Sequence, residues 1–167
     1  KLNKFYYVVD GEFELTIKLK NTSASQAIAN MTVNAQLQGE YFTLISDTDT
    51  EVIAALIERF VLEKEDVELA VRHVMSLIHG SYALGIIDSE NPEVLYAAKN
   101  KSPMLIGLGE GFNMIGSDAM AMLQCTNQFV EIEDEEFIKL TRENVEIYNL
   151  LGVKIKRDSF TAELDAS

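Results

Sequence analysis

The densest group of chemistry-bearing residues is the run Ser46-Asp47-Thr48-Asp49-Thr50-Glu51. A carboxylate that is held by local hydrogen bonds stays ionised and could face a cationic group, such as the ammonium of a ligand. The same acids could instead serve a helix that follows them, because negative charge at a helix N-terminus opposes the positive end of the helix dipole. The spacing alone leaves both interpretations open, an ammonium-binding site and simple helix capping.

The glycine-rich segment Gly107-Leu-Gly109-Glu-Gly111 could form a phosphate-binding loop, because glycines let backbone N–H groups approach an anion. Such a loop needs a helix N-terminus directly after it, whereas residues 112–115 are typical of a strand. A glycine-rich hairpin turn is therefore the favoured interpretation.

The two histidines and the single cysteine carry weaker signals. His73 and His79 are six residues apart, which does not place two metal ligands on one face of a helix, and both are expected at the surface. Cys125 has no sequence sign of a nearby base, so we expect a packed or semi-exposed thiol and not a nucleophile. No metal site is predicted.

Two amphipathic helices are predicted to follow the acidic run. Thr48 and Glu51 have the spacing of a capping box. Apolar residues then recur at helical spacing, at Val52, Ile53, Leu56, Ile57, Phe60 and Val61. A second helix is predicted from about Asp66 to Gly80, because a glycine suits a left-handed C-terminal cap.

Short apolar runs bounded by Gly, Pro, Asn or Asp predict strands over the rest of the chain. They are residues 81–87, 94–98, 104–108, 113–116, 129–132, 136–140, 145–148 and 153–156. We expect the last four to form a meander with acidic turns at 133–135 and 142–144, and residues 118–125 to form a short Met-rich helix.

The N-terminal part is less regular. Residues 5–9 and 13–19 flank Asp10-Gly11, a two-residue turn signal, and predict a hairpin. Residues 21–40 have no sustained period and predict a loop or a weak helix.

Length and composition indicate one globular domain, with 167 residues of which 47% are hydrophobic and 25% charged. A single cysteine excludes an intramolecular disulfide and favours a reducing compartment. The net charge of −13 lies entirely in residues 45–167 and opposes binding to nucleic acid or to an anionic membrane. With no membrane-length apolar run and no signal-peptide core, the chain is expected to be soluble and cytoplasmic.

Six blocks in order resemble the glutaminase domains, of the class II glutamine amidotransferase type, of the glutamine–fructose-6-phosphate aminotransferases (isomerising), also called glucosamine-6-phosphate synthases. The blocks are Ser46-Asp-Thr-Asp-Thr-Glu-Val-Ile53, His79-Gly-Ser-Tyr-Ala-Leu84, Ala98-Lys-Asn-Lys-Ser-Pro103, Ile106-Gly-Leu-Gly-Glu-Gly111, Gly116-Ser-Asp118 and Ser159-Phe-Thr-Ala-Glu-Leu164. The resemblance covers residues 46–164, and residues 1–45 match weakly. It implies one glutaminase-like domain over residues 1–167.

The resemblance implies an α+β fold, the four-layer αββα sandwich of N-terminal-nucleophile (Ntn) hydrolases, either whole or incomplete at its N-terminal side. It also implies hydrolysis of glutamine by an N-terminal cysteine whose α-amine is the general base. A sugar-isomerase domain would use the ammonia to convert fructose 6-phosphate into glucosamine 6-phosphate. Glutamine and that domain are the implied partners, no cofactor is implied, and a homo-oligomer is left open. Asp49, the second acid of the first block, would hold the α-ammonium of glutamine.

The chain departs from the family pattern at its N-terminal side. Lys1 stands where the family begins with Cys-Gly-Ile, and the family's Arg-Trp-Ala-Thr-His-Gly and His-Asn-Gly blocks are missing. Cys125 cannot replace the nucleophile because its own nitrogen is in a peptide bond, and Asn34 receives no role. No catalytic residue is assigned, so the chain as written is expected to be inactive. Either residues 1–45 are joined fragments of a larger enzyme, which is favoured, or the chain is a catalytically dead structural or binding module.

Overall fold

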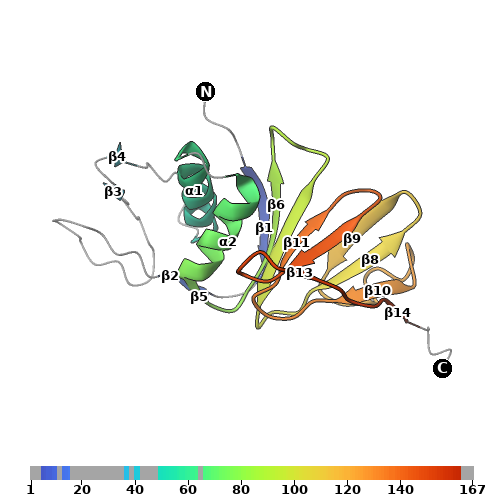
Figure 1. The fold of residues 1–167 in the computed structure, drawn as a ribbon. Helices are drawn as coiled ribbons and strands as arrows, with labels where there is room; N and C mark the ends of the chain where they lie inside the picture. Colours follow the sequence, from blue (N-terminus) through green and yellow to red (C-terminus); the bar gives the residue numbers. More distant parts are fainter. Residues whose placement is uncertain are drawn as a thin grey trace. The chain divides into compact units, whose positions relative to one another are not determined.

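The computed structural model describes residues 5–10, 13–15, 36–37, 40–41, 49–63 and 66–162 (Figure 1). The chain divides into two compact units, one of Glu14–His79 and the other of Lys1–Phe13 with Gly80–Ser167. The first contains the helices and the second contains the two large sheets.

Two helices, α1 (Asp49–Leu62) and α2 (Val67–Leu77), contact each other in the Glu14–His79 unit. Their apolar stripes are buried, with Ile53 and Ile57 on α1 and Val71 and Val74 on α2. Asp66 caps α2, since its carboxylate accepts a hydrogen bond of 2.7 Å from the Leu69 N–H. Both predicted helices are thereby confirmed.

The predicted end of the second helix is wrong. The helix ends at Leu77, and Ile78 is already extended, with its N–H bonded to the Val74 carbonyl. Residues Ile78–Gly80 form strand β5, which pairs with β2 (Phe13–Leu15). Ile78 is β-branched, which favours a strand, and its side chain is buried in β5.

The predicted hairpin around Asp10-Gly11 is also wrong. Strand β1 (Phe5–Asp10) pairs antiparallel with β6 along its whole length, and β2 pairs with β5, so the two N-terminal strands do not pair with each other. Within the stretch predicted as loop or weak helix, β3 (Gln36–Leu37) and β4 (Glu40–Tyr41) form a small antiparallel pair. The remainder of that stretch lies outside the described residues.

Two antiparallel sheets form the other unit. The six-stranded sheet has the order β1-β6-β7-β11-β12-β13, and the four-stranded sheet has the order β14-β10-β8-β9. Their further strands are β6 (Tyr82–Asp88), β7 (Leu95–Asn100), β8 (Leu105–Gly109), β9 (Phe112–Gly116), β10 (Gln128–Glu131), β11 (Phe137–Leu140), β12 (Val145–Tyr148), β13 (Lys154–Ile155) and β14 (Phe160–Thr161). The eight strands predicted after residue 80 are confirmed, and β14 is an additional strand.

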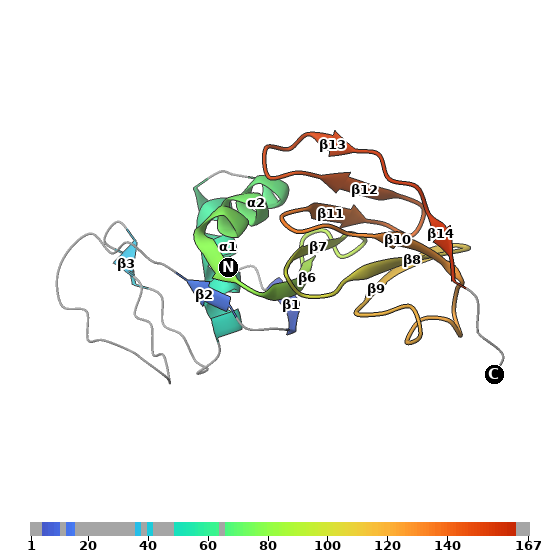
Figure 2. The ribbon, with the colours of Figure 1, turned by 90° about the horizontal axis from the view of Figure 1, so that it is seen from below.

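The predicted meander over the last four strands is only partly correct, because the chain changes sheets between the first and the second of them. Strands β11, β12 and β13 follow one another in one sheet, but β10 lies in the other sheet (Figure 2). Residues 132–136 cross from β10 to β11, and residues 156–159 cross back from β13 to β14. The predicted Met-rich helix over 118–125 is a series of turns, in which the Asp118 carboxylate accepts the Ala121 N–H at 2.9 Å.

An apolar core lies between the two sheets. It contains residues of the six-stranded sheet, among them Ala97, Ile138 and Ile147, and residues of the four-stranded sheet, among them Ile106 and Val130. The two sheets therefore pack face to face around this shared core. The two packed sheets correspond to the two inner layers of the expected αββα sandwich.

One ion pair ties the two crossing segments together. The Arg157 guanidinium, in the second crossing, contacts the Glu136 carboxylate at 2.5 Å and the Glu133 carboxylate at 3.0 Å, both in the first crossing. The Glu136 side chain is only 5% exposed, and it also accepts the Glu133 N–H at 2.8 Å. Its charge is compensated by these contacts, which a buried carboxylate requires.

A second ion pair holds the first crossing against β7. The Lys99 ammonium contacts the Asp134 carboxylate at 2.7 Å, and the same carboxylate oxygen accepts the Lys101 N–H at 2.7 Å. The hydrogen bond from Lys99 is the main cause that lowers the pKa of Asp134 below its usual range. The Lys99 ammonium also donates to the Ile132 carbonyl at 3.2 Å.

Replacing Arg157 by alanine should strongly destabilise the sheets, because the buried Glu136 carboxylate would lose its cation. We expect the free energy of unfolding to fall by about 3 kcal/mol, as for other broken buried pairs. Arg142→Ala is the matched control, since Arg142 and its partner Glu93 are both exposed and 3.9 Å apart; its loss should stay below about 1 kcal/mol. Urea denaturation measures both, and equal losses would contradict the assigned role of the pair.

Asp134→Asn should lower stability at neutral pH, and the difference from the unchanged chain should shrink in acid. Because the folded state lowers the pKa of Asp134, its contribution is present above the unfolded pKa of about 4 and is lost as the pH falls through the folded value. The carboxylate is partly exposed, so the effect should stay within about 1 kcal/mol. Urea denaturation between pH 7 and about pH 3 measures it. Glu143→Gln, at an exposed carboxylate, should show no such trend.

Candidate functional site

The acidic run begins the first helix, as predicted. Asp49 is the first residue of α1, so the helix axis starts at the residue for which a substrate contact was expected. The Asp49 side chain, Ser46, Asp47 and Thr48 lie outside what the structure describes. The structure therefore does not test whether Asp49 contacts an ammonium group or caps the helix, and the ammonium contact stays a prediction.

Two of the family-like blocks come together at one end of the six-stranded sheet. The block from His79 to Leu84 enters β6 and the block from Ala98 to Pro103 leaves β7, with Tyr82 opposite Asn100 in the pairing register. The Asn100 amide donates a hydrogen bond of 2.5 Å to the Gly80 carbonyl. Gly80 has a φ of 108°, which a side chain would strain, so a glycine is required where β5 passes into β6.

The turn after β7 is strained and is held by the acidic crossing segment. Lys101 and Glu135 both have positive φ, 59° and 63°, although neither is a glycine. The Asp134 carboxylate fixes the Lys101 N–H, and the Glu135 N–H donates to the Lys99 carbonyl at 3.0 Å. Backbone strain that is held by such contacts is common at functional sites.

Tyr82 lies in this end of the sheet and is buried. Burial is the main cause that raises the pKa of the Tyr82 phenol, and the negative charges of Glu135 and Asp134 raise it further. The phenol is therefore protonated at neutral pH and cannot act as a general base.

The sequence analysis assigned no role to Lys99 or Asp134, although their contact fixes the turn at this end of the six-stranded sheet. Asp134 belongs to a segment that was predicted only as an acidic turn, and Lys99 is far from it in the chain. Their contact depends on the pairing of β7 with β11, which local patterns do not reveal.

The glycine-rich segment forms the predicted hairpin and not a phosphate loop. Strands β8 and β9 pair through a turn at Glu110 and Gly111, with φ of 73° at Gly111. The ring of Phe112 covers Gly109, where a Cβ atom would come within 2.2 Å of it. These glycines serve the turn and close packing.

The remaining candidate residues lie at the surface. His73 is exposed, and its ring stacks on Phe60 with centroids 3.9 Å apart. His79 and Cys125 are exposed as well. The residues described in the structure contain no group of three His, Cys, Asp or Glu that could hold a metal ion.

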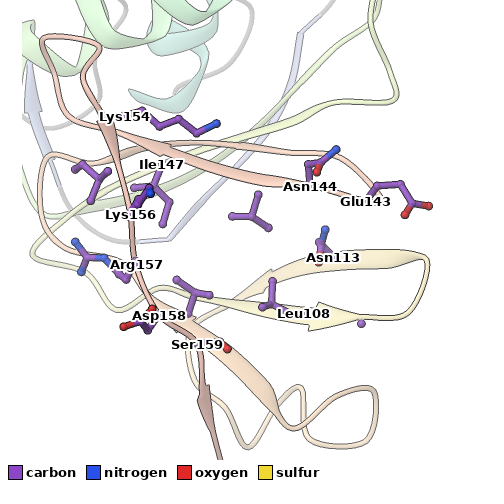
Figure 3. A pocket seen from close by; sticks show the side chains of 14 residues that line it. Leu108, Asn113, Glu143, Asn144, Ile147, Lys154, Lys156, Arg157, Asp158 and Ser159 are labelled. Carbon is purple, nitrogen blue, oxygen red and sulfur yellow. The ribbon is translucent and has the colours of Figure 1, made fainter.

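A slot of about 580 Å³ opens between the two sheets (Figure 3). Its apolar walls come from both sheets: Leu108, Val130, Val145, Ile147 and Ile155. Charged and polar side chains also line it: Asn113, Glu143, Asn144, Lys154, Lys156, Arg157, Asp158 and Ser159. A slot lined by apolar and polar side chains can accept an apolar side chain or an amphipathic ligand.

Hydrogen bonds and ion pairs fix several of these polar side chains. The Asn113 amide donates to the Thr141 carbonyl at 2.8 Å, and so bridges the two sheets at one end of the slot. The Lys154 ammonium contacts the Glu146 carboxylate at 2.5 Å and lowers the pKa of Glu146. In the described part of the chain, the exposed Lys156 ammonium has no ion pair.

No family model matches the chain. Curated relatives called glutamine–fructose-6-phosphate aminotransferase [isomerizing] do match it. The protein of Bacillus cereus (strain ATCC 10987) is 55% identical over 125 residues, which are 75% of this chain and 21% of the relative. That of Geobacillus kaustophilus is 58% identical over 122 residues (73% and 20%), and that of Halalkalibacterium halodurans is 51% identical over 135 residues (79% and 22%).

The chain thus spans about a fifth of the length of the curated relatives it matches. No helix in the described residues has the length and apolar character needed to cross a membrane.

A solved structure supports the fold. The glutamine phosphoribosylpyrophosphate amidotransferase of B. subtilis, in complex with ADP and GMP, superposes with a TM-score of 0.54 at 24% identity. The superposition covers 68% of this chain and 24% of that one. The expected α+β fold of an Ntn-type amidotransferase is therefore confirmed. Together with this fold, the identity of half or more of the aligned residues shows that the chain is homologous to about a fifth of the length of the glutamine–fructose-6-phosphate aminotransferases.

Proposed function

We propose that this chain is part of a glutaminase that supplies ammonia for amino-sugar synthesis. Water would hydrolyse the side-chain amide of glutamine, leaving glutamate and releasing ammonia. A sugar-isomerase part of the same protein would use the ammonia to convert fructose 6-phosphate into glucosamine 6-phosphate. The observation that carries the proposal is the identity of 51–58% to relatives with this activity in their name.

The proposal treats residues 1–167 as one glutaminase-like domain, with residues 46–164 as its family-like part. Strand β1 supports this view, because it pairs with β6 through all of its residues and so belongs to the same sheet as the family-like strands. A cytoplasmic location is part of the proposal, since a single cysteine suits a reducing compartment.

Asp49 is the residue that we propose to contact the substrate. Its position at the first residue of α1 suits a carboxylate that stays ionised, because the helix dipole favours negative charge there. An ionised carboxylate could pair with the α-ammonium of glutamine and so select an amino acid with a free α-amine. The family-like block around Asp49 is the support for this role.

A chimera tests the proposed activity. Residues 46–164 would replace the matching segment of the Geobacillus kaustophilus relative, which is 58% identical over 122 residues. We expect the chimera to form glucosamine 6-phosphate from glutamine and fructose 6-phosphate. A folded chimera that uses added ammonia but not glutamine would contradict the proposal and would favour a catalytically dead module.

Within the chimera, Asp49→Ala should raise KM for glutamine by about tenfold or more, because a lost charge-assisted contact costs roughly 1.5–3 kcal/mol. The rate with added ammonia should not change. Asp47→Ala is the matched control, since Asp47 belongs to the same acidic run but is not expected to touch glutamine. An unchanged KM in Asp49→Ala, or equal changes in both variants, would contradict the substrate contact and would favour a role of Asp49 as a helix cap.

A further inference from the structure

The slot between the two sheets has the size and the lining of a small-molecule site. Its volume of about 580 Å³ lies within the usual range of about 300–1,000 Å³ for ligand pockets. Leu108 and Val130 line it from the four-stranded sheet, and Val145 and Ile147 line it from the six-stranded sheet (Figure 3). Apolar surface of this kind favours contact with a hydrocarbon group over contact with water.

Hydrogen bonds and an ion pair hold the slot open at both ends. At one end, the Asn113 amide of β9 donates to the Thr141 carbonyl, which follows β11 of the other sheet. At the other end, Arg157 lines the slot and is fixed by its contact with the buried Glu136 carboxylate. A ligand therefore enters a site that is already formed, and less ordering is needed when it binds.

One positive charge in the slot is free to meet a ligand. Lys154, Lys156 and Arg157 all line it. Lys154 and Arg157 already contact carboxylates that do not line the slot. Lys156 is exposed and, within the described residues, has no ion pair. An anionic group can therefore pair with the Lys156 ammonium near the solvent while an apolar group lies between the sheets.

Two acids in the slot limit the charge of such a ligand. Glu143 and Asp158 also line it, and neither has an ion pair in the described part of the chain. Their charges oppose a dianion, such as a phosphate monoester, more strongly than a single carboxylate. The Ser159 hydroxyl lines the slot as well and can donate a hydrogen bond to a carboxylate oxygen.

We propose that the slot binds a small amphipathic carboxylate, with its hydrocarbon chain between the sheets and its carboxylate on the Lys156 ammonium. The slot is built entirely by the sheet unit, whereas Asp49 belongs to the other unit. This binding site therefore goes beyond the proposed hydrolysis of glutamine and does not rest on it.

Isothermal titration calorimetry with sodium octanoate tests the site. The 167-residue chain is titrated at about 0.15 M ionic strength, where its net charge of −13 is screened beyond about 8 Å, and octanoate is kept monomeric. We expect saturable binding of one octanoate per chain. Shortening the probe to hexanoate should raise the dissociation constant about tenfold, because two fewer CH₂ groups are buried.

Lys156→Met should raise the dissociation constant for octanoate about fivefold and leave that for 1-octanol unchanged, because only octanoate carries a charge. Lys156→Arg should keep the preference for octanoate. Arg142→Met is the matched control, since it removes the same charge from an exposed side chain that does not line the slot. This control should leave both dissociation constants unchanged.

Filling the slot provides a second measurement that does not depend on charge. Val145 is half-buried, and Val145→Phe should abolish the binding of octanoate and of 1-octanol alike. Thermal unfolding verifies that each variant stays folded. The same titrations are repeated with the chimera, because residues 46–164 contain the whole slot.

Four results would overturn the proposal. They are the absence of saturable octanoate binding to the folded chain and chimera, equal affinity for octanoate and 1-octanol, equal effects of Lys156→Met and Arg142→Met, and binding that survives Val145→Phe.

Discussion

The contact between Arg157 and Glu136 joins two of the three segments in which the chain passes from one large sheet to the other. Each crossing brings its strands to opposite sides of a common apolar core, so the position of one sheet on the other depends on how these crossings are held. A buried carboxylate is tolerated here because it has both a cation and a backbone donor. Burial of the apolar core provides most of the driving force for folding, and the ion pair holds two of the crossing segments together.

The same crossings line two hollows of the sheet unit. Residues 133–136 form one wall of the acidic hollow, and residues 156–159 cross one end of the slot (Figure 3). Ile155 separates them. Charged and apolar side chains thus occur side by side on one hairpin.

Contacts over both short and long separations in the chain set the backbone geometry of the family-like blocks. Gly80 is needed for its positive φ and is held by the Asn100 amide, and Gly109 is needed because the Phe112 ring covers it. Asp134 fixes the strained turn that follows β7. These residues shape the backbone of the blocks, whereas the contact between Asp49 and glutamine stays a proposal.

Local patterns in the sequence determined the elements. The helical period and the acid at position 66 placed both helices, alternating apolar runs placed the eight strands after residue 80, and the glycines at 109 and 111 marked the β8–β9 hairpin. Tertiary structure alone decided that β1 pairs with β6, that β10 and β11 lie in different sheets, and that Lys99 meets Asp134. The reason is physical. A period of two or 3.6 residues in the apolar pattern indicates which side of a strand or helix is buried. Packing between distant segments decides which element covers that side.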